Sequence, residues 1–181
     1  NSGLAAVVVG DGTDDIIKTL WAYGADKVYS IDGDGLSPYS AEIHSDFISQ
    51  AIKAHQPSVF LAPSTANGRD VMPRVAACLG LGLTGDAIGL EINSEGRLVA
   101  LKPAYGGNIV AAILSRSTTQ MATVRPGVLT IATPDWTRNG TVKKLKFVPT
   151  RTYPKRIERT AVGTEGLDLE DSEVVICLGQ G

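Results

Sequence analysis

The stretch LAPSTANGRDVMPRVAACLGLGLTGDA, residues 61–87, carries the pattern that decides the fold class. Its apolar start runs into a loop of small and polar residues, and a predicted helix then opens with Gly68-Arg69-Asp70. An apolar segment, a polar loop and a helix in this order are typical of one unit of a parallel α/β sheet. Because such sheets bind ligands at the carboxyl ends of their strands, the loop is also the first candidate site.

The residues before this stretch repeat the same unit twice. Their apolar runs predict strands, and the amphipathic stretches between them predict helices. Thr13 is the predicted N-cap of the first helix, and Ser37 with Pro38 forms the predicted start of the second. The predicted strands cover residues 4–10, 27–31 and 58–63, and the predicted helices cover residues 13–24, 37–56 and 68–80. This alternation predicts an α/β fold around a mostly parallel sheet.

Beyond residue 83 the pattern changes, because strands follow one another without helices. Polar turns separate them at residues 93–96 and at Gly106-Gly107, and both turns are hairpin signals. We expect these segments to form a small antiparallel β meander or to extend one edge of the parallel sheet. The predicted strands cover residues 84–92, 97–105, 108–115 and 121–132, and the basic segment 141–160 predicts one more strand and an exposed arm.

The composition argues against several classes of function. Seventeen basic residues against nineteen acidic ones give a net charge of −2, which provides no general attraction for nucleic acid. No apolar run approaches the roughly 18 residues that a membrane span needs, so no span is predicted. Cys78 and Cys177 lie outside any CxxC pair, which favours two free thiols over a disulfide or a metal pair.

The loop in the opening stretch is the strongest candidate for a ligand site. Small polar groups follow the predicted strand at Ser64, Thr65, Asn67 and Gly68. Arg69 comes next and could face an anion at the start of the helix. The same loop could instead cap the helix, with Arg69 paired to Asp70 or Asp86. The residues leave both interpretations open, a nucleotide site and a helix cap.

A second loop, Gly10-Asp11-Gly12, lies between the first predicted strand and helix, and Asp32 follows twenty residues later. This arrangement loosely matches the dinucleotide-binding fingerprint. However, Asp15 occupies the position of the third glycine, and Asp11, Asp14 and Asp15 would repel a pyrophosphate from the helix N-terminus. A capped turn is the better interpretation of this loop.

The remaining polar residues form no recognisable catalytic or metal centre. Arg125, between Val124 and Pro126, is expected to be half-buried against a carboxylate or carbonyl partner. His44 and His55 lie eleven residues apart on one predicted helix, too far for one metal, and are expected to face solvent. The sequence contains no GxSxG, HExxH or P-loop motif. We therefore predict no catalytic residue and no metal ligand.

Three motifs, taken in order, resemble one family. APSTANGRDVMPRVAACLGLGLTGDA, KPAYGGN and ATVRPGVL are similar to the first domain of electron transfer flavoprotein alpha subunits. The resemblance extends over nearly the whole chain. It implies a three-layer α/β/α domain with a mostly parallel sheet, related to the adenine-nucleotide alpha-hydrolase fold, over residues 1–160.

The resemblance implies a scaffold and interface role rather than an enzyme activity. In that family the alpha subunit pairs with a beta subunit that usually holds AMP, and the complete protein carries electrons on FAD. The electrons pass from dehydrogenases to a membrane quinone reductase or another acceptor. The family implies a location in the bacterial or archaeal cytoplasm or in the mitochondrial matrix.

Two rival interpretations stay open beside this one. The first is an AMP- or ATP-binding domain with its site at Ser64, Thr65, Asn67 and Arg69. The second is an interaction module whose basic arm, residues 143–159, docks an acidic partner.

The end of the chain departs from the family pattern. Residues 161–181 resemble the linker and first strand of the FAD-binding domain. Gln180 stands where the family has an arginine beside FAD, and Gln180 with Gly181 would form the edge of the FAD loop. The resemblance thus implies a chain truncated before the FAD-binding domain, which by itself is expected to bind no FAD.

Overall fold

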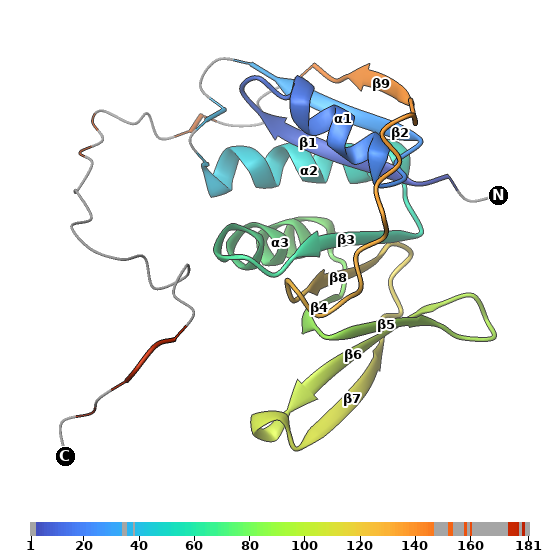
Figure 1. Cartoon of the computed structure of the whole chain (residues 1–181), viewed down its shortest axis with the longest axis vertical. Coiled ribbons are helices and arrows are strands. Elements are labelled where there is room, and N and C mark those ends of the chain that lie inside the picture. Colours follow the sequence, from blue (N-terminus) through green and yellow to red (C-terminus); the bar gives the residue numbers. More distant parts are fainter. Residues whose placement is uncertain are drawn as a thin grey trace.

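The computed structural model describes residues 3–33, 36–37, 39–146, 152–153, 158, 160, 174–177 and 179. Three α-helices and nine strands lie within these residues (Figure 1). The first half alternates β1 (Ala5–Gly10), α1 (Asp14–Ala22), β2 (Lys27–Asp32), α2 (Ala41–His55), β3 (Val59–Pro63) and α3 (Ala66–Leu79). The second half contains β4 (Leu83–Ala87), β5 (Gly89–Ile92), β6 (Leu98–Ala104), the 3-10 turn η1 (Tyr105–Gly107), β7 (Ile109–Leu114), β8 (Gln120–Val124) and β9 (Thr141–Lys144).

The described strands form three sheets of three strands each. Two sheets are parallel, with the orders β1-β2-β9 and β3-β8-β4, and the third, β5-β6-β7, is antiparallel. In Figure 1 the antiparallel sheet projects from the lower end of the molecule. The predicted α/β class and the predicted antiparallel meander are both confirmed.

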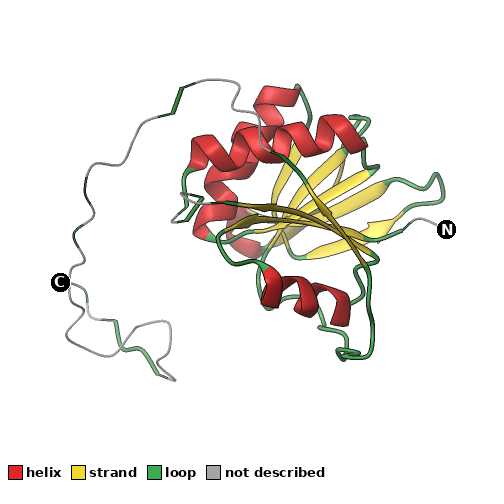
Figure 2. Ribbon diagram, turned by 90° about the horizontal axis from the view of Figure 1, so that it is seen from above, coloured by secondary structure: helices red, strands yellow, loops and turns green. Residues whose placement is uncertain are grey.

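Helices cover both faces of the parallel strands, so the fold has three layers (Figure 2). On one face α1 packs on β1 and β2 through a cluster that includes Val8, Ile17 and Val28. On the other face α2 and α3 pack against each other and on β3 and β8, with Met72 and Met121 at the centre of the cluster. These buried apolar side chains are the main stabilising contacts of the domain.

Three predicted strand boundaries in the second half are wrong. The segment predicted as one strand over residues 84–92 is two strands, because the backbone of Asp86 enters the left-handed region at φ 61° before β5 begins. The strand predicted over residues 121–132 ends at Val124, and Gly127 follows in a turn at φ 76°. Moreover, β8 lies between β3 and β4 in a parallel sheet rather than in the meander.

The predicted start of the second helix is also wrong. The helix begins at Ala41 after the extended residue Ser40, and not at Pro38. The N–H of Ser37 instead donates to the carboxylate of Asp11 at 3.3 Å, which ties this segment to the loop after β1. The capping residues are therefore one turn later than the Ser-Pro signal indicates.

Candidate functional site

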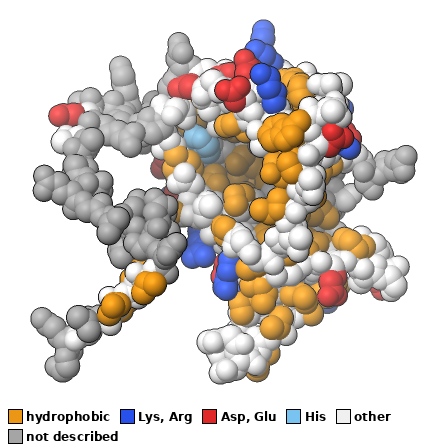
Figure 3. Space-filling model, viewed as in Figure 1, with side chains coloured by type: hydrophobic (Ala, Val, Ile, Leu, Met, Phe, Trp, Pro, Cys, Tyr) orange, Lys and Arg blue, Asp and Glu red, His pale blue; other side chains and the backbone are white. Residues whose placement is uncertain are grey.

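A cavity of about 500 Å³ opens between the carboxyl ends of β1 and β3. Its walls are apolar and include Val7, Val9, Phe60 and Met72, and the polar groups of its rim include those of Asp11, Ser37, Thr65 and Asn67. Figure 3 shows hydrophobic side chains gathered over the same side of the molecule. This is the edge of the sheet at which the sequence predicts a ligand.

Thr65 acts as the N-cap of α3. Its Oγ1 accepts a hydrogen bond from the N–H of Gly68 at 3.2 Å, and the helix begins at Ala66. Gly68 packs directly against the end of β3, since a Cβ at this position would collide with the carbonyl oxygen of Pro63. The loop that the sequence offers as a site therefore performs the structural task of joining β3 to α3.

Arg69 turns toward protein groups rather than toward the cavity rim. Its Nε donates to Oγ of the buried Ser64 at 3.1 Å, and its terminal nitrogen lies 3.3 Å from the carboxylate of Asp86. Of the four candidate residues, Thr65 and Asn67 line the cavity, whereas Ser64 and Arg69 contact β4 and β8 through Asp86 and Thr123. The structure thus divides the predicted site into two parts.

Asp86 is the centre of an ion cluster that we call the Asp86 cluster, formed by Arg69, Asp86 and Arg125. The guanidinium of Arg125 lies 2.6 Å from one carboxylate oxygen of Asp86, and Arg69 lies 3.3 Å from the other. The hydrogen bond from Arg125 and the charges of both arginines lower the pKa of Asp86 to about 2. The expected carboxylate partner of Arg125 is therefore Asp86, which the sequence offers only for Arg69.

The glycine loop after β1 is closed by the protein's own carboxylate. One oxygen of Asp32 accepts from the N–H of Gly12 at 3.1 Å, and the other accepts from Oγ1 of Thr13 at 3.3 Å. These groups at the start of α1 are the ones that a bound pyrophosphate would use. The capped-turn interpretation is confirmed, with Asp32 rather than the side chain of Thr13 supplying the cap.

Two residues on the cavity wall are absent from the sequence prediction. Tyr39 donates from its hydroxyl to Asp70 at 3.0 Å, and burial together with this carboxylate raises the pKa of Tyr39 to about 12. His44 is half-buried, its Nδ1 lies 2.9 Å from the carbonyl oxygen of Ser40, and burial lowers its pKa.

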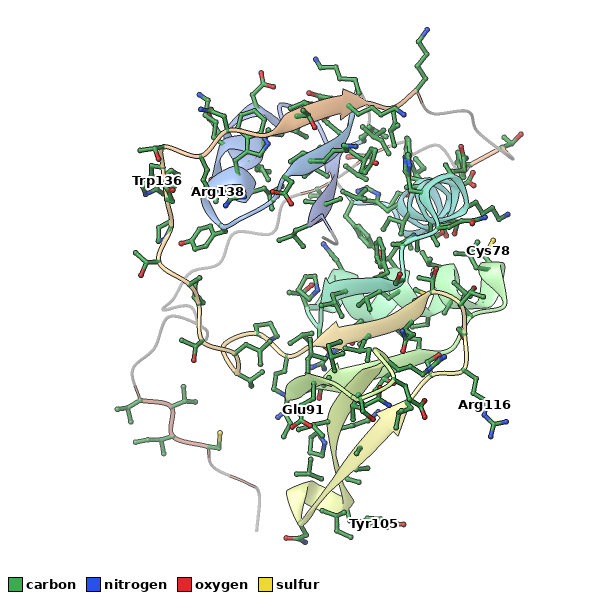
Figure 4. All side chains as sticks on the ribbon, turned by 90° about the vertical axis from the view of Figure 1, so that its right-hand side faces the viewer. Cys78, Glu91, Tyr105, Arg116, Trp136 and Arg138 are labelled. Atoms are coloured by element: carbon green, nitrogen blue, oxygen red, sulfur yellow. The ribbon has the colours of Figure 1, made fainter. Side chains whose placement is uncertain are left out.

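The prediction that both histidines face solvent is wrong. His44 lines the cavity, and the half-buried His55 stacks on Tyr29 with ring centroids 4.1 Å apart. Within the described ranges, no three His, Cys, Asp or Glu side chains are grouped so that they could hold a metal ion. Cys78, labelled in Figure 4, and Cys177 are both exposed free thiols.

Some predicted features fall on residues that the structure does not describe. Gln180 and Gly181, the predicted edge of the FAD loop, lie outside the described residues, as does most of the segment 161–181. Of the predicted basic arm, Lys143 and Lys144 lie on β9 and are exposed. No helix among the described residues combines the length and the apolar character that crossing a membrane requires.

Comparison with known proteins adds independent findings. A family model described as "Electron transfer flavoprotein domain" matches residues 1–149. The chain is 37% identical to the electron transfer flavoprotein subunit alpha of Thermoanaerobacterium thermosaccharolyticum, over 98% of this chain and 55% of that protein. It is 34% identical to the corresponding subunit of Megasphaera elsdenii, over 98% of this chain and 54% of that protein.

A third relative carries a different name. The chain is 31% identical to the lactate dehydrogenase (NAD(+),ferredoxin) subunit LctC of Acetobacterium woodii, over 97% of this chain and 43% of that protein. The chain spans about half the length of the curated relatives it matches.

Proposed function

The chain belongs to the electron transfer flavoprotein family, and we propose that it is the scaffold and interface domain of an alpha-type subunit. The observation that carries the proposal is the similarity to alpha subunits over 98% of the chain, from β1 to the last residues. In the complete protein, this domain would pair with a beta-type subunit and support an FAD-binding domain. The complete protein would carry electrons from dehydrogenases to a quinone reductase or another acceptor.

The proposed role assigns no catalytic residue and no cofactor to these 181 residues. Three contacts support it: Thr65 caps α3, Arg69 pairs with Asp86, and Asp32 occupies the amide of the Gly12 turn. Each of these groups would have to leave its partner before it could hold a phosphate. For the FAD loop, the proposal that Gln180 and Gly181 mark its edge rests on the family resemblance.

The antiparallel sheet offers the surface for the partner subunit. β7 pairs only with β6 among the described strands, and three of its apolar side chains are about half exposed: Ile109, Val110 and Leu114. Tyr105, at the tip of the hairpin in Figure 4, is 81% exposed. A projecting surface with exposed apolar side chains fits a permanent protein partner better than solvent.

The test is complex formation with the cognate beta-type subunit, measured by size-exclusion chromatography with light scattering. A one-to-one complex is expected, and Ile109→Lys is expected to weaken it at least tenfold. Ile16→Lys is the matched control, because Ile16 on α1 is exposed to the same extent, 52% against 53%. Absence of any complex with the unmodified chain would refute the proposal, and equal effects of the two variants would refute the surface.

One observation favours the alternative, an AMP- or ATP-binding domain. Thr65 and Asn67 line the 500 Å³ cavity at the N-terminus of α3, a position suited to a phosphate. Titration calorimetry with AMP and ATP separates the two proposals. Saturable binding that Asn67→Ala and Arg69→Ala weaken would favour the alternative, and no heat of binding would favour the scaffold.

The cellular location is proposed from the relatives alone. The curated relatives named above are bacterial proteins, which favours the bacterial cytoplasm over the mitochondrial matrix. For the basic arm, we propose no nucleic-acid partner, because the net charge of −2 gives none.

A further inference from the structure

The two parallel sheets face each other across strands that are paired on one side only. β1 pairs with β2, and β3 pairs with β8, while no described strand pairs with the opposite edge of either. Unpaired edges of apolar strands are costly, because their N–H and C=O groups lack partners and can pair with other chains. In Figure 1 these two edges lie on either side of the space between the upper and lower sheets.

The backbone direction of β1 follows from its contacts with β2. The N–H of Leu4 donates to the carboxylate of Asp26 at 2.9 Å, and its carbonyl accepts from the N–H of Asp26 at 2.8 Å. In a parallel strand both polar groups of a residue point to the same side, and the side alternates along the chain. The even-numbered residues of β1 therefore face β2, and the polar groups of Val7 and Val9 face away from it.

The same reasoning gives the direction of β3. The carbonyl of Ser58 accepts from Gln120 at 2.9 Å, and the N–H of Ser64 donates to Val124 at 2.7 Å, so even-numbered residues face β8. The polar groups of Val59 and Leu61 consequently face the space beside β1. Two rows of backbone donors and acceptors thus point toward each other across this space.

The space has the width and the lining of one more strand. α2 and α3 pack against each other on one face, α2 beside β1 and α3 beside β3. Packed helices lie about 8–10 Å apart, and two strand spacings are about 9.6 Å. The cavity between the strands is lined by Val7, Val9, Phe60 and Ala62 from the strands and by Ile48 and Met72 from the helices.

We propose that one extended polypeptide segment lies between β1 and β3, parallel to both, and joins the two sheets into one sheet of seven strands. Its backbone would pair with Val7 and Val9 on one side and with Val59 and Leu61 on the other. Its alternate side chains would be apolar, because one face of the space is covered by α2 and α3. This inference goes beyond the proposed function and does not depend on it.

The segment belongs to the longer polypeptide that contains these residues. The chain spans about half the length of its curated relatives, so such a protein has ample additional chain. An intramolecular strand also has a much higher effective concentration than a strand from another molecule. A second copy of the chain and a small ligand are the other possible occupants, and the experiment distinguishes them.

Hydrogen exchange of single amides tests the occupant. In the full-length protein the amides of Val7, Val9 and Leu61 are expected to exchange at least about a hundredfold more slowly than in the 181-residue chain. The matched controls are Val142 and Lys144 on the outer edge of β9, which face away from β2 because Thr141 and Leu145 donate to it. Equal exchange of Val7, Val9 and Leu61 in both proteins would overturn the proposal. Slow exchange in a dimer of the 181-residue chain would assign the segment to a second copy and overturn the intramolecular source.

A disulfide test measures the width of the space in the 181-residue chain itself. In a background without Cys78 and Cys177, the pair Val9→Cys and Ala62→Cys is expected to stay reduced, because two strand spacings exceed the roughly 7 Å reach of a disulfide. The control pair Val9→Cys and Ile31→Cys is expected to oxidise, since these residues are register partners in adjacent strands. Oxidation of the first pair would show that β1 and β3 close directly on each other and would overturn the proposal.

Discussion

Arg125 and Asp86 join the ends of two neighbouring strands, with 2.6 Å between the guanidinium and the carboxylate. The backbone contributes to the same junction, because the N–H of Arg125 donates to the carbonyl of Ala87 at 2.9 Å. Asp86 holds its position with a left-handed backbone, at φ 61°, and its own N–H donates to Oγ1 of Thr123. This junction fixes the point at which β4 and β8 stop pairing and the chain turns toward β5.

The charge of Asp86 should make this junction sensitive to acid. Its pKa is about 2 in the folded protein, below the ordinary value of 3.8, so its contribution to stability is present above about pH 4 and is lost as the pH falls toward 2. The difference in urea midpoint between the unmodified chain and Asp86→Asn should therefore shrink between pH 5 and pH 2.5. A difference that stays constant over this range would contradict the ion-pair explanation.

Loss of the cap on α3 should destabilise the fold without touching its core. Thr65→Ala removes the acceptor for the N–H of Gly68 and should lower the free energy of unfolding by about 1 kcal/mol. Thr65→Ser keeps the hydroxyl and is the control, with little change expected. Urea denaturation followed by circular dichroism measures both variants, and equal stability of Thr65→Ala and Thr65→Ser would show that the cap is not needed.

The close approach of α3 to β3 should tolerate no side chain at position 68. Gly68→Ala places a methyl group against the carbonyl of Pro63 and should cost at least about 2 kcal/mol of unfolding free energy. Gly10→Ala is the control, because its nearest contact would be an ordinary 3.8 Å from Thr13. Thermal denaturation of the two variants is the measurement, and a Gly68→Ala protein as stable as Gly10→Ala would contradict the packing described here.

The attachment of β9 should depend on Gly140 in a similar way. A Cβ at this position would lie 2.5 Å from the indole nitrogen of Trp21 and 2.7 Å from the carbonyl of Asp26. Gly140→Ala should therefore displace Trp21 and shift its fluorescence to the red. The measurement uses a Trp136→Phe background, because Trp136 is 67% exposed and would obscure the signal. An unchanged spectrum would show that β9 can move aside without disturbing α1.

The first half of the fold is predictable from the sequence because its signals are local. Buried strands, amphipathic helices and glycine stops act within a few residues, and they place α1 and α3 to within two residues of their observed starts. The Ser37-Pro38 signal fails because a distant group, the carboxylate of Asp11, binds the N–H of Ser37. A pairing across 26 residues leaves no trace in the local pattern.

The second half is less predictable because strand order is not a local property. Nothing in the residues of β8 distinguishes a strand of the meander from one inserted between β3 and β4. The candidate site shows the same limit. The sequence identifies Arg69 and Asp86 as possible partners, but it does not pair Arg125 with Asp86 or place Asp32 on the Gly12 turn.

The central claim is that the loop from Ser64 to Arg69 serves the fold and holds no nucleotide. The most direct measurement is the absorbance spectrum of the small molecules released when the purified chain is denatured. The account predicts no band at the wavelengths of adenine or flavin. An adenine band in stoichiometric amount would contradict it and identify this loop as a nucleotide site, and a flavin band would contradict the assignment of FAD to another part of the protein.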